Sequence, residues 1–144
     1  MRRLYWALVV GVASVTAACT RDNNQLTLPI TDTNVVGSFN LTSANGRVLP
    51  YTAFLTSTAQ WDVAADRIVI AADNTWADTT SYNVSDLTTG AVTSQSTATA
   101  GTYKIANGQI QFVMTDGGTA IFAGAVQGNT LSVLFNGQPF IYAR

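Results

Sequence analysis

Tight turn signals at short intervals constrain the fold of this chain more than any other feature of its sequence. Asn107-Gly108, Gly128-Asn129 and Asn136-Gly137 each stand between two short segments in which apolar and polar residues alternate. Asn-Gly is the strongest of these signals, because both central residues of a type I′ hairpin turn need a positive φ. The pattern therefore predicts consecutive antiparallel strands, each with alternate side chains on one face.

The same alternation predicts about eight strands, and the composition agrees. The chain is rich in Thr, Ala and Val and contains no Glu and a single Lys, a balance that favours strands over helices. The expected strands cover residues 35–42, 67–72, 75–84, 92–105, 109–115, 119–126, 130–135 and 138–143, with a weaker extended segment over 50–57. Residues 59–66 fit no strand pattern, and Trp61, Val63 and Ala64 there allow a short helix across a barrel mouth.

An eight-stranded meander leaves two unpaired edges unless it closes. Closure into an up-and-down antiparallel barrel removes both edges, so we predict an all-β barrel over residues 35–144. A two-sheet sandwich or a half-open barrel is the alternative, although a sandwich would need longer crossing connections than these short turns. One domain is expected for a chain of this length.

The first 19 residues have the layout of an export signal. Arg2 and Arg3 form a positive start, residues 4–15 are apolar over about the length of a signal-peptide core, and residues 16–18 are small. Cys19 follows directly. This order resembles the lipobox of bacterial lipoproteins.

The lipobox resemblance implies that residues 1–18, a signal helix, are removed and that the thiol of Cys19 is diacylated. The chain would then be anchored in the bacterial cell envelope, and Thr20 after the cysteine implies the outer membrane. The alternative is an ordinary export signal cleaved after residue 18, which would leave a free thiol. Residues 19–34 are then the lipidated cysteine and a flexible tether, since they lack apolar periodicity.

Charged side chains are few and mostly acidic. The chain has seven Lys and Arg residues and eight acids, all of them Asp. Removing Arg2 and Arg3 with the signal leaves five cations against eight acids, a net charge of −3. Nucleic-acid binding needs clustered Lys and Arg, so we expect no nucleic-acid partner. A monomer is expected.

Residues for catalysis or metal binding are scarce. Histidine is absent and Cys19 is the single cysteine, so a Ser-His-Asp triad and an internal disulfide are both excluded. Asp62 and Asp66 are four residues apart, and Asp73 and Asp78 are five apart. Paired carboxylates support acid–base chemistry, but Asp is also a common turn residue, and we interpret all four as turn residues. We therefore predict no enzyme activity, no metal and no cofactor.

Short motifs mark the start and the end of the expected barrel. They are Gly37-Ser38-Phe39, Leu41, Asn45-Gly46, Leu49-Pro50, Gly101-Thr102-Tyr103, Gly128-Asn129-Thr130-Leu131 and the terminal FIYAR of residues 140–144. Together they resemble small lipocalin-like lipoproteins of bacteria, over nearly all of residues 35–144. The resemblance implies a small calycin-type barrel whose bottom is closed by Phe39, with Arg144 packed over it as a cation–π pair. Phe39 stands where lipocalins have Trp.

Large apolar side chains on the inward faces suggest what the barrel does. The candidates for ligand contact are Trp76, Tyr82, Tyr103, Phe112 and Met114. Small eight-stranded barrels either fill their interior with such side chains or hold one small ligand. A pocket predicts a non-enzymatic barrel that binds a small apolar or amphipathic ligand. A filled core predicts a protein-interaction module, of protease-inhibitor or envelope-assembly type, that contacts its partner through residues 44–49 and 85–94.

Overall fold

A computed structural model describes residues 29, 31–115 and 120–144, and every regular element in them is a β-strand. No helix among these residues could cross a membrane. The strands are β1 Gly37–Ala44, β2 Arg47–Val48, β3 Tyr51–Leu55, β4 Ala59–Ile70, β5 Thr75–Asp86, β6 Val92–Ala106, β7 Gln109–Met114, β8 Ala120–Gln127, β9 Thr130–Phe135 and β10 Gln138–Ala143. The predicted signal helix over 1–18 and Cys19 lie outside the described residues.

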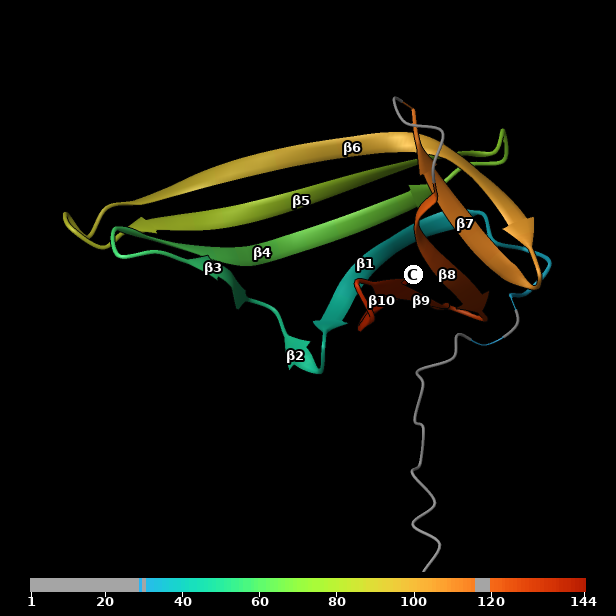
Figure 1. Cartoon of the computed structure of the whole chain (residues 1–144), viewed down its shortest axis with the longest axis horizontal. Coiled ribbons are helices and arrows are strands. Elements are labelled where there is room, and N and C mark those ends of the chain that lie inside the picture. Colours follow the sequence, from blue (N-terminus) through green and yellow to red (C-terminus); the bar gives the residue numbers. More distant parts are fainter. Residues whose placement is uncertain (1–28, 30, 116–119) are drawn as a thin grey trace, which may run out of the picture.

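Eight of the strands form a closed antiparallel barrel (Figure 1). Strands β4 to β10 pair in chain order, β10 pairs with β1, and β1 closes the ring by pairing with β4. The turn residues Asn107 and Gly108 have φ values of 53° and 73°, as a type I′ hairpin requires. The predicted all-β barrel is thus confirmed, and the sandwich alternative is wrong because β1 and β4 join the two ends of the sheet.

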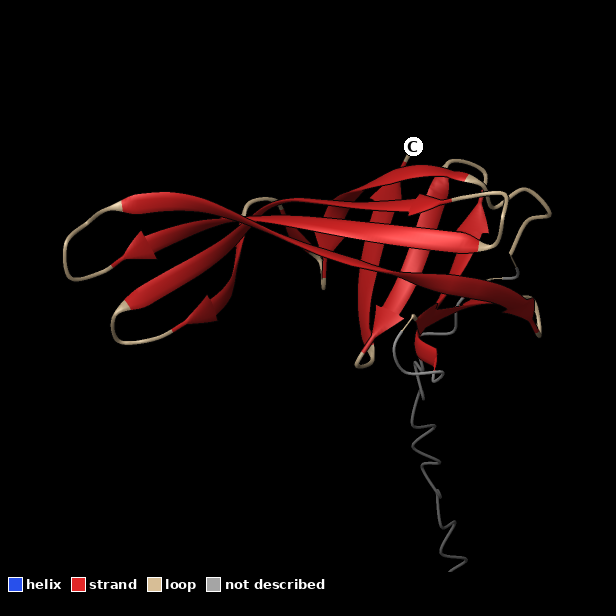
Figure 2. Cartoon of the chain, turned by 90° about the horizontal axis from the view of Figure 1, so that it is seen from above, coloured by secondary structure: helices blue, strands red, loops and turns tan. Residues whose placement is uncertain are grey.

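Three strands extend well beyond the barrel. β4 pairs with β1 only through residues 67–70, and β6 pairs with β7 only through residues 101–106. The remaining halves of β4 and β6 pair with the second half of β5 and with β3 to form a projecting four-stranded sheet, which we call the arm (Figure 2). The arm consists of β3 and residues 59–65, 80–86 and 92–98. At the end of the arm the loop between β3 and β4 and the loop between β5 and β6 are joined by a 2.8 Å hydrogen bond from the amide of Leu87 to the carbonyl of Thr58.

The arm corrects one expectation from the sequence. The short helix allowed for residues 59–66 is wrong, because these residues form the first part of β4. The register of β4 against β5 shifts between Val63 and Ala65, which marks a β-bulge. A bulge adds one residue to one strand, so Val63 and Asp66 are both buried although they differ in parity. The added residue also breaks the alternation that would have identified the strand.

At the end of the barrel where β1 begins and β10 finishes, the side chain of Phe39 is fully buried. The guanidinium carbon of Arg144 lies 5.2 Å from the centre of the Phe39 ring. The same guanidinium donates hydrogen bonds to the carbonyls of Val36, at 2.9 Å, and Gly128, at 2.6 Å. The first and last parts of the domain are therefore held together at this end by one side chain.

The segment expected to be a tether is fixed to the barrel at its C-terminal end. The amide of Thr31 donates to the carbonyl of Gly108 at 2.7 Å, and the amide of Asp32 donates to that of Val126 at 2.8 Å. The carboxylate of Asp32 also accepts a 2.6 Å hydrogen bond from the amide of Gly128. The part of the chain held by the barrel therefore begins at least four residues before the expected boundary at residue 35.

Candidate functional site

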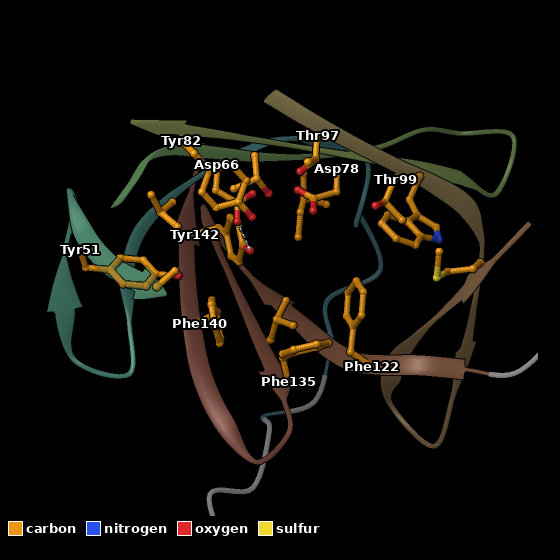
Figure 3. Close-up of a pocket in the computed structure, with 17 residues that line it drawn as sticks. Tyr51, Asp66, Asp78, Tyr82, Thr97, Thr99, Phe122, Phe135, Phe140 and Tyr142 are labelled. Carbon is orange, nitrogen blue, oxygen red and sulfur yellow. Dashed lines mark hydrogen bonds between the residues drawn. The ribbon is translucent and has the colours of Figure 1, made fainter. Parts of the chain in front are cut away.

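The barrel interior contains a cavity of about 420 Å³ (Figure 3). One wall comes from β4, β5 and β6, and the opposite wall comes from β8, β9 and β10. Tyr51 of β3 lies at the end nearer the arm. The cavity therefore reaches from the barrel core towards the base of the arm.

The wall formed by β4, β5 and β6 is polar. In the sheet register Asp78 of β5 lies opposite Thr99 of β6, and Thr80 lies opposite Thr97. Alternation along β5 turns Asp78 and Thr80 to the same side, and Asp66 of β4 joins them in lining the cavity. Two carboxyl groups and three hydroxyl groups therefore face the cavity from one sheet.

The opposite wall is aromatic. Phe122 of β8, Phe135 of β9 and Phe140 of β10 form a row, with ring centres 6.4 Å and 6.3 Å apart in edge-to-face contacts. Trp76 meets the end of this row, its ring centre 5.3 Å from that of Phe122. These contacts hold the aromatic side chains in place, so the cavity has one apolar wall of fixed shape.

Asp66 and Asp78 form an acid pair in which Asp66 is buried and Asp78 is half-buried. Asp66 is only 9% exposed, and its Oδ2 accepts a 3.3 Å hydrogen bond from the Tyr142 hydroxyl. The Oδ1 atoms of both aspartates are buried and have no hydrogen-bond donor among the described residues. Burial raises the pKa of Asp66 to about 8, with further contributions from a hydrogen bond to Asp78 and from its charge.

Asp66 is therefore protonated at neutral pH. Burial also raises the pKa of Asp78, while its hydrogen bond with Asp66 acts in the opposite direction. The Tyr142 hydroxyl stays neutral, because burial and the two nearby aspartates raise its pKa. Burial and the charge of Asp66 raise the pKa of Tyr51 as well.

The structure separates the five predicted ligand contacts into two groups. Trp76, Tyr82 and Met114 line the cavity. Phe112 is fully buried and stacks on Phe122 at 4.6 Å, so it supports the aromatic wall from behind. Tyr103 is not a lining residue, and its hydroxyl donates a 3.0 Å hydrogen bond to the carbonyl of Ala71.

The acid pair was missed because spacing along the chain suggested the wrong partners. Asp62 does not pair with Asp66, since it accepts hydrogen bonds from Thr52 and Gln60 instead. Asp73 does not pair with Asp78 but lies in the turn before β5, where it accepts a 2.6 Å hydrogen bond from Thr75. The interpretation of Asp62, Asp66 and Asp78 as turn residues is therefore wrong, because all three lie within strands, and only Asp73 lies in a turn.

The cavity is suited to binding an organic molecule. Among the described residues no three His, Cys, Asp or Glu side chains come together as a metal site would require. Of the residues that the structure describes, Asp66 and Asp78 are the only charged ones that line the cavity, and aromatic rings face them. No family model, no curated protein and no solved structure matches the chain. Its function is therefore inferred from the cavity itself.

Proposed function

We propose that this chain is a lipocalin-like envelope lipoprotein whose barrel binds one small amphipathic ligand without catalysing a reaction. The cavity of about 420 Å³ carries this proposal. Its volume lies within the range of roughly 300–1,000 Å³ that is usual for ligand pockets. A barrel that served only as a rigid interaction module would be expected to fill its interior, because protein cores pack with few voids.

The arrangement of the two carboxyl groups differs from that of a glycosidase. Paired carboxyl groups cleave glycosides when they are separated by about 5–9.5 Å, which leaves room for the substrate bond between them. Asp66 and Asp78 instead share a hydrogen bond with each other. The chain has no histidine that would act as a general base. A polar end and an aromatic wall together suit a ligand with one polar and one apolar part.

Filling the cavity should abolish ligand binding. We expect Thr99→Trp to place an indole in the cavity and to remove the saturable binding of decan-1-ol that the wild-type chain shows. The measurement is isothermal titration calorimetry on the full chain in digitonin, a detergent whose ring system is too large for a cavity of about 420 Å³.

Thr102→Trp is the matched control, because Thr102 is exposed on the same strand and does not line the cavity. It should bind decan-1-ol as the wild type does. Equal binding by Thr99→Trp would place the ligand elsewhere. No binding by any of the three proteins would refute the proposal and favour the alternative, a protein-interaction module. Leu87 and Val92, which are 50% and 63% exposed at the end of the arm, would then be the first contacts to test.

Cys19 should carry the lipid anchor. We expect the chain, expressed in a bacterium with two membranes and fed an alkyne-tagged fatty acid, to incorporate the tag and to sediment with the outer membrane. Cys19→Ser removes the only thiol in the chain and should abolish labelling. Labelling that persists in this variant would refute lipidation at Cys19 while leaving the cavity proposal intact.

A further inference from the structure

The acid pair is the only source of charge among the described residues that line the cavity. No Lys or Arg is among them, and their other polar groups are Thr and Tyr hydroxyls and the Trp76 indole N–H. Asp66 is 9% exposed, and neither its Oδ1 nor that of Asp78 has a hydrogen-bond donor among the described residues. A negative charge in the barrel therefore has no positive partner there.

A buried charge without a partner is energetically unfavourable, which suggests that a ligand supplies the partner. Transfer of an ionised carboxylate into a protein interior is unfavourable unless a cation or several hydrogen-bond donors surround it. Asp66 accepts a hydrogen bond from Tyr142, whereas the neighbouring lining positions Thr80, Thr97 and Thr99 are uncharged. Strongly perturbed groups inside a cavity are candidates for functional sites.

The side chains around the pair match an organic cation. The Tyr142 hydroxyl already donates to Oδ2 of Asp66, and apart from the two acids themselves the described residues offer no donor to either Oδ1. Aromatic rings attract cations through their faces, and Tyr51, Tyr82 and Tyr142 all line the cavity around the acids. The phenylalanine wall on the opposite side would contact an apolar tail (Figure 3).

We propose that the ligand is a cationic amphiphile: an amine or ammonium group that binds between Asp66 and Asp78, attached to an apolar body that packs on Phe122, Phe135 and Phe140. This inference rests on the proposed function and specifies the ligand class. A phosphate next to the cation would be disfavoured, since no cationic side chain of the described residues lines the cavity to balance it.

Four ligands with the same decyl chain test the proposal. Decylamine, decan-1-ol, decanoate and decylphosphocholine are titrated at pH 7 into the full chain in digitonin, with Thr99→Trp in the same micelles as the blank. Hydrogen bonds to charged groups predict that decylamine binds about 10- to 100-fold more tightly than decan-1-ol. Decanoate and decylphosphocholine should bind no more tightly than decan-1-ol.

The double variant Asp66→Asn with Asp78→Asn removes the charge and keeps the size of both side chains. It should bind decylamine no more tightly than decan-1-ol, and a cooperative urea-unfolding transition shows that it is folded. Asp62→Asn is the matched control on β4, because Asp62 does not line the cavity, and its preference should be unchanged.

Each outcome separates the two proposals. If decan-1-ol binds as tightly as decylamine, or if the double variant keeps the preference, the cationic ligand is refuted and the ligand-binding barrel stands. If decylphosphocholine matches or exceeds decylamine, the isolated cation is refuted in favour of a lipid headgroup. If none of the four ligands binds above the blank, the proposed function fails, and the inference fails with it.

Discussion

Asp66→Asn is expected to make the barrel more stable at pH 8.5, by on the order of 3 kcal/mol, and to change its stability little at pH 4. The folded state holds the Asp66 proton until about pH 8, whereas the group has an ordinary pKa of 3.8. Between these values the folded state binds more protons than the unfolded state, so raising the pH favours unfolding. The stability that protonated Asp66 contributes is therefore fully present below about pH 4 and lost as the pH rises to about 8.

The amide of Asn copies the protonated acid at every pH. Its NH₂ group is able to donate to Asp78 as the carboxyl proton does, and its oxygen is able to accept from the Tyr142 hydroxyl. Urea unfolding between pH 4 and 9 measures the effect, with an expected loss in the wild type of up to about 1.4 kcal/mol per pH unit. If the difference in the free energy of unfolding between variant and wild type does not widen as the pH rises, the result contradicts the acid pair.

Asp73→Asn is the control with the opposite sign. Hydrogen bonds from Thr75 lower the pKa of Asp73, so its ionised form stabilises the fold and is lost as the pH falls through that pKa. This substitution should therefore reduce stability slightly above that pKa. The two variants differ only in whether the carboxyl lies in the cavity or in an exposed turn. Together they separate a general effect of removing negative charge from the effect of removing it from the barrel interior.

The acid pair thus weakens the fold at the pH values where it would bind a cation. A neutral pair at positions 66 and 78 would stabilise the barrel over the same range, yet it would remove the only charge that described residues bring to the cavity. Binding sites commonly hold groups that the fold would be more stable without. A cationic ligand would reverse the balance, because any molecule that binds only the folded state increases its stability by mass action.

The sequence determined the hairpin half of the fold well. The last two strands occupy the predicted residues 130–135 and 138–143, and Asn136 and Gly137 between them have φ values of 50° and 74°. Local chemistry suffices there, because the turn residues fix the register and alternation fixes the face. Ring closure also followed from local features, since a meander of this length needs a partner for each edge.

The arm and the acid pair could not be read in the same way. The bulge after Val63 reverses the alternation within β4, so a search for a regular period ends the strand too early and leaves Asp66 outside it. Asp66 and Asp78 meet only through the pairing of β4 with β5, which sequence spacing does not give. One signal was present, since Asp78 has the same parity as Trp76 and Tyr82, both of which line the cavity.

Gly101→Ala is expected to destabilise the barrel by about 3 kcal/mol or more, because the backbone of β7 occupies the space that a side chain would need. A Cβ at Gly101 would collide with the carbonyl oxygen of Val113 and lie 2.8 Å from Nε1 of Trp76. That carbonyl also accepts a 3.1 Å hydrogen bond from the Trp76 indole. Because β7 is paired on both sides, neither group is able to move without breaking strand pairing or leaving the indole N–H unsatisfied.

The turn variant Gly128→Ala separates this collision from the ordinary effect of replacing glycine. Gly128 has a φ of 56° and nothing within 4 Å of its would-be Cβ, so only backbone strain of about 1–2 kcal/mol is expected. Urea unfolding followed by tryptophan fluorescence compares the two variants, and equal losses of stability would contradict the close contact between β6 and β7.

Trp76 also lines the cavity, so a folded Gly101→Ala chain should bind decan-1-ol more weakly than a Gly128→Ala chain. Stability and ligand binding would then both depend on Gly101. This glycine lets β6 and β7 lie close together and fixes Trp76, which lies between the core and the cavity.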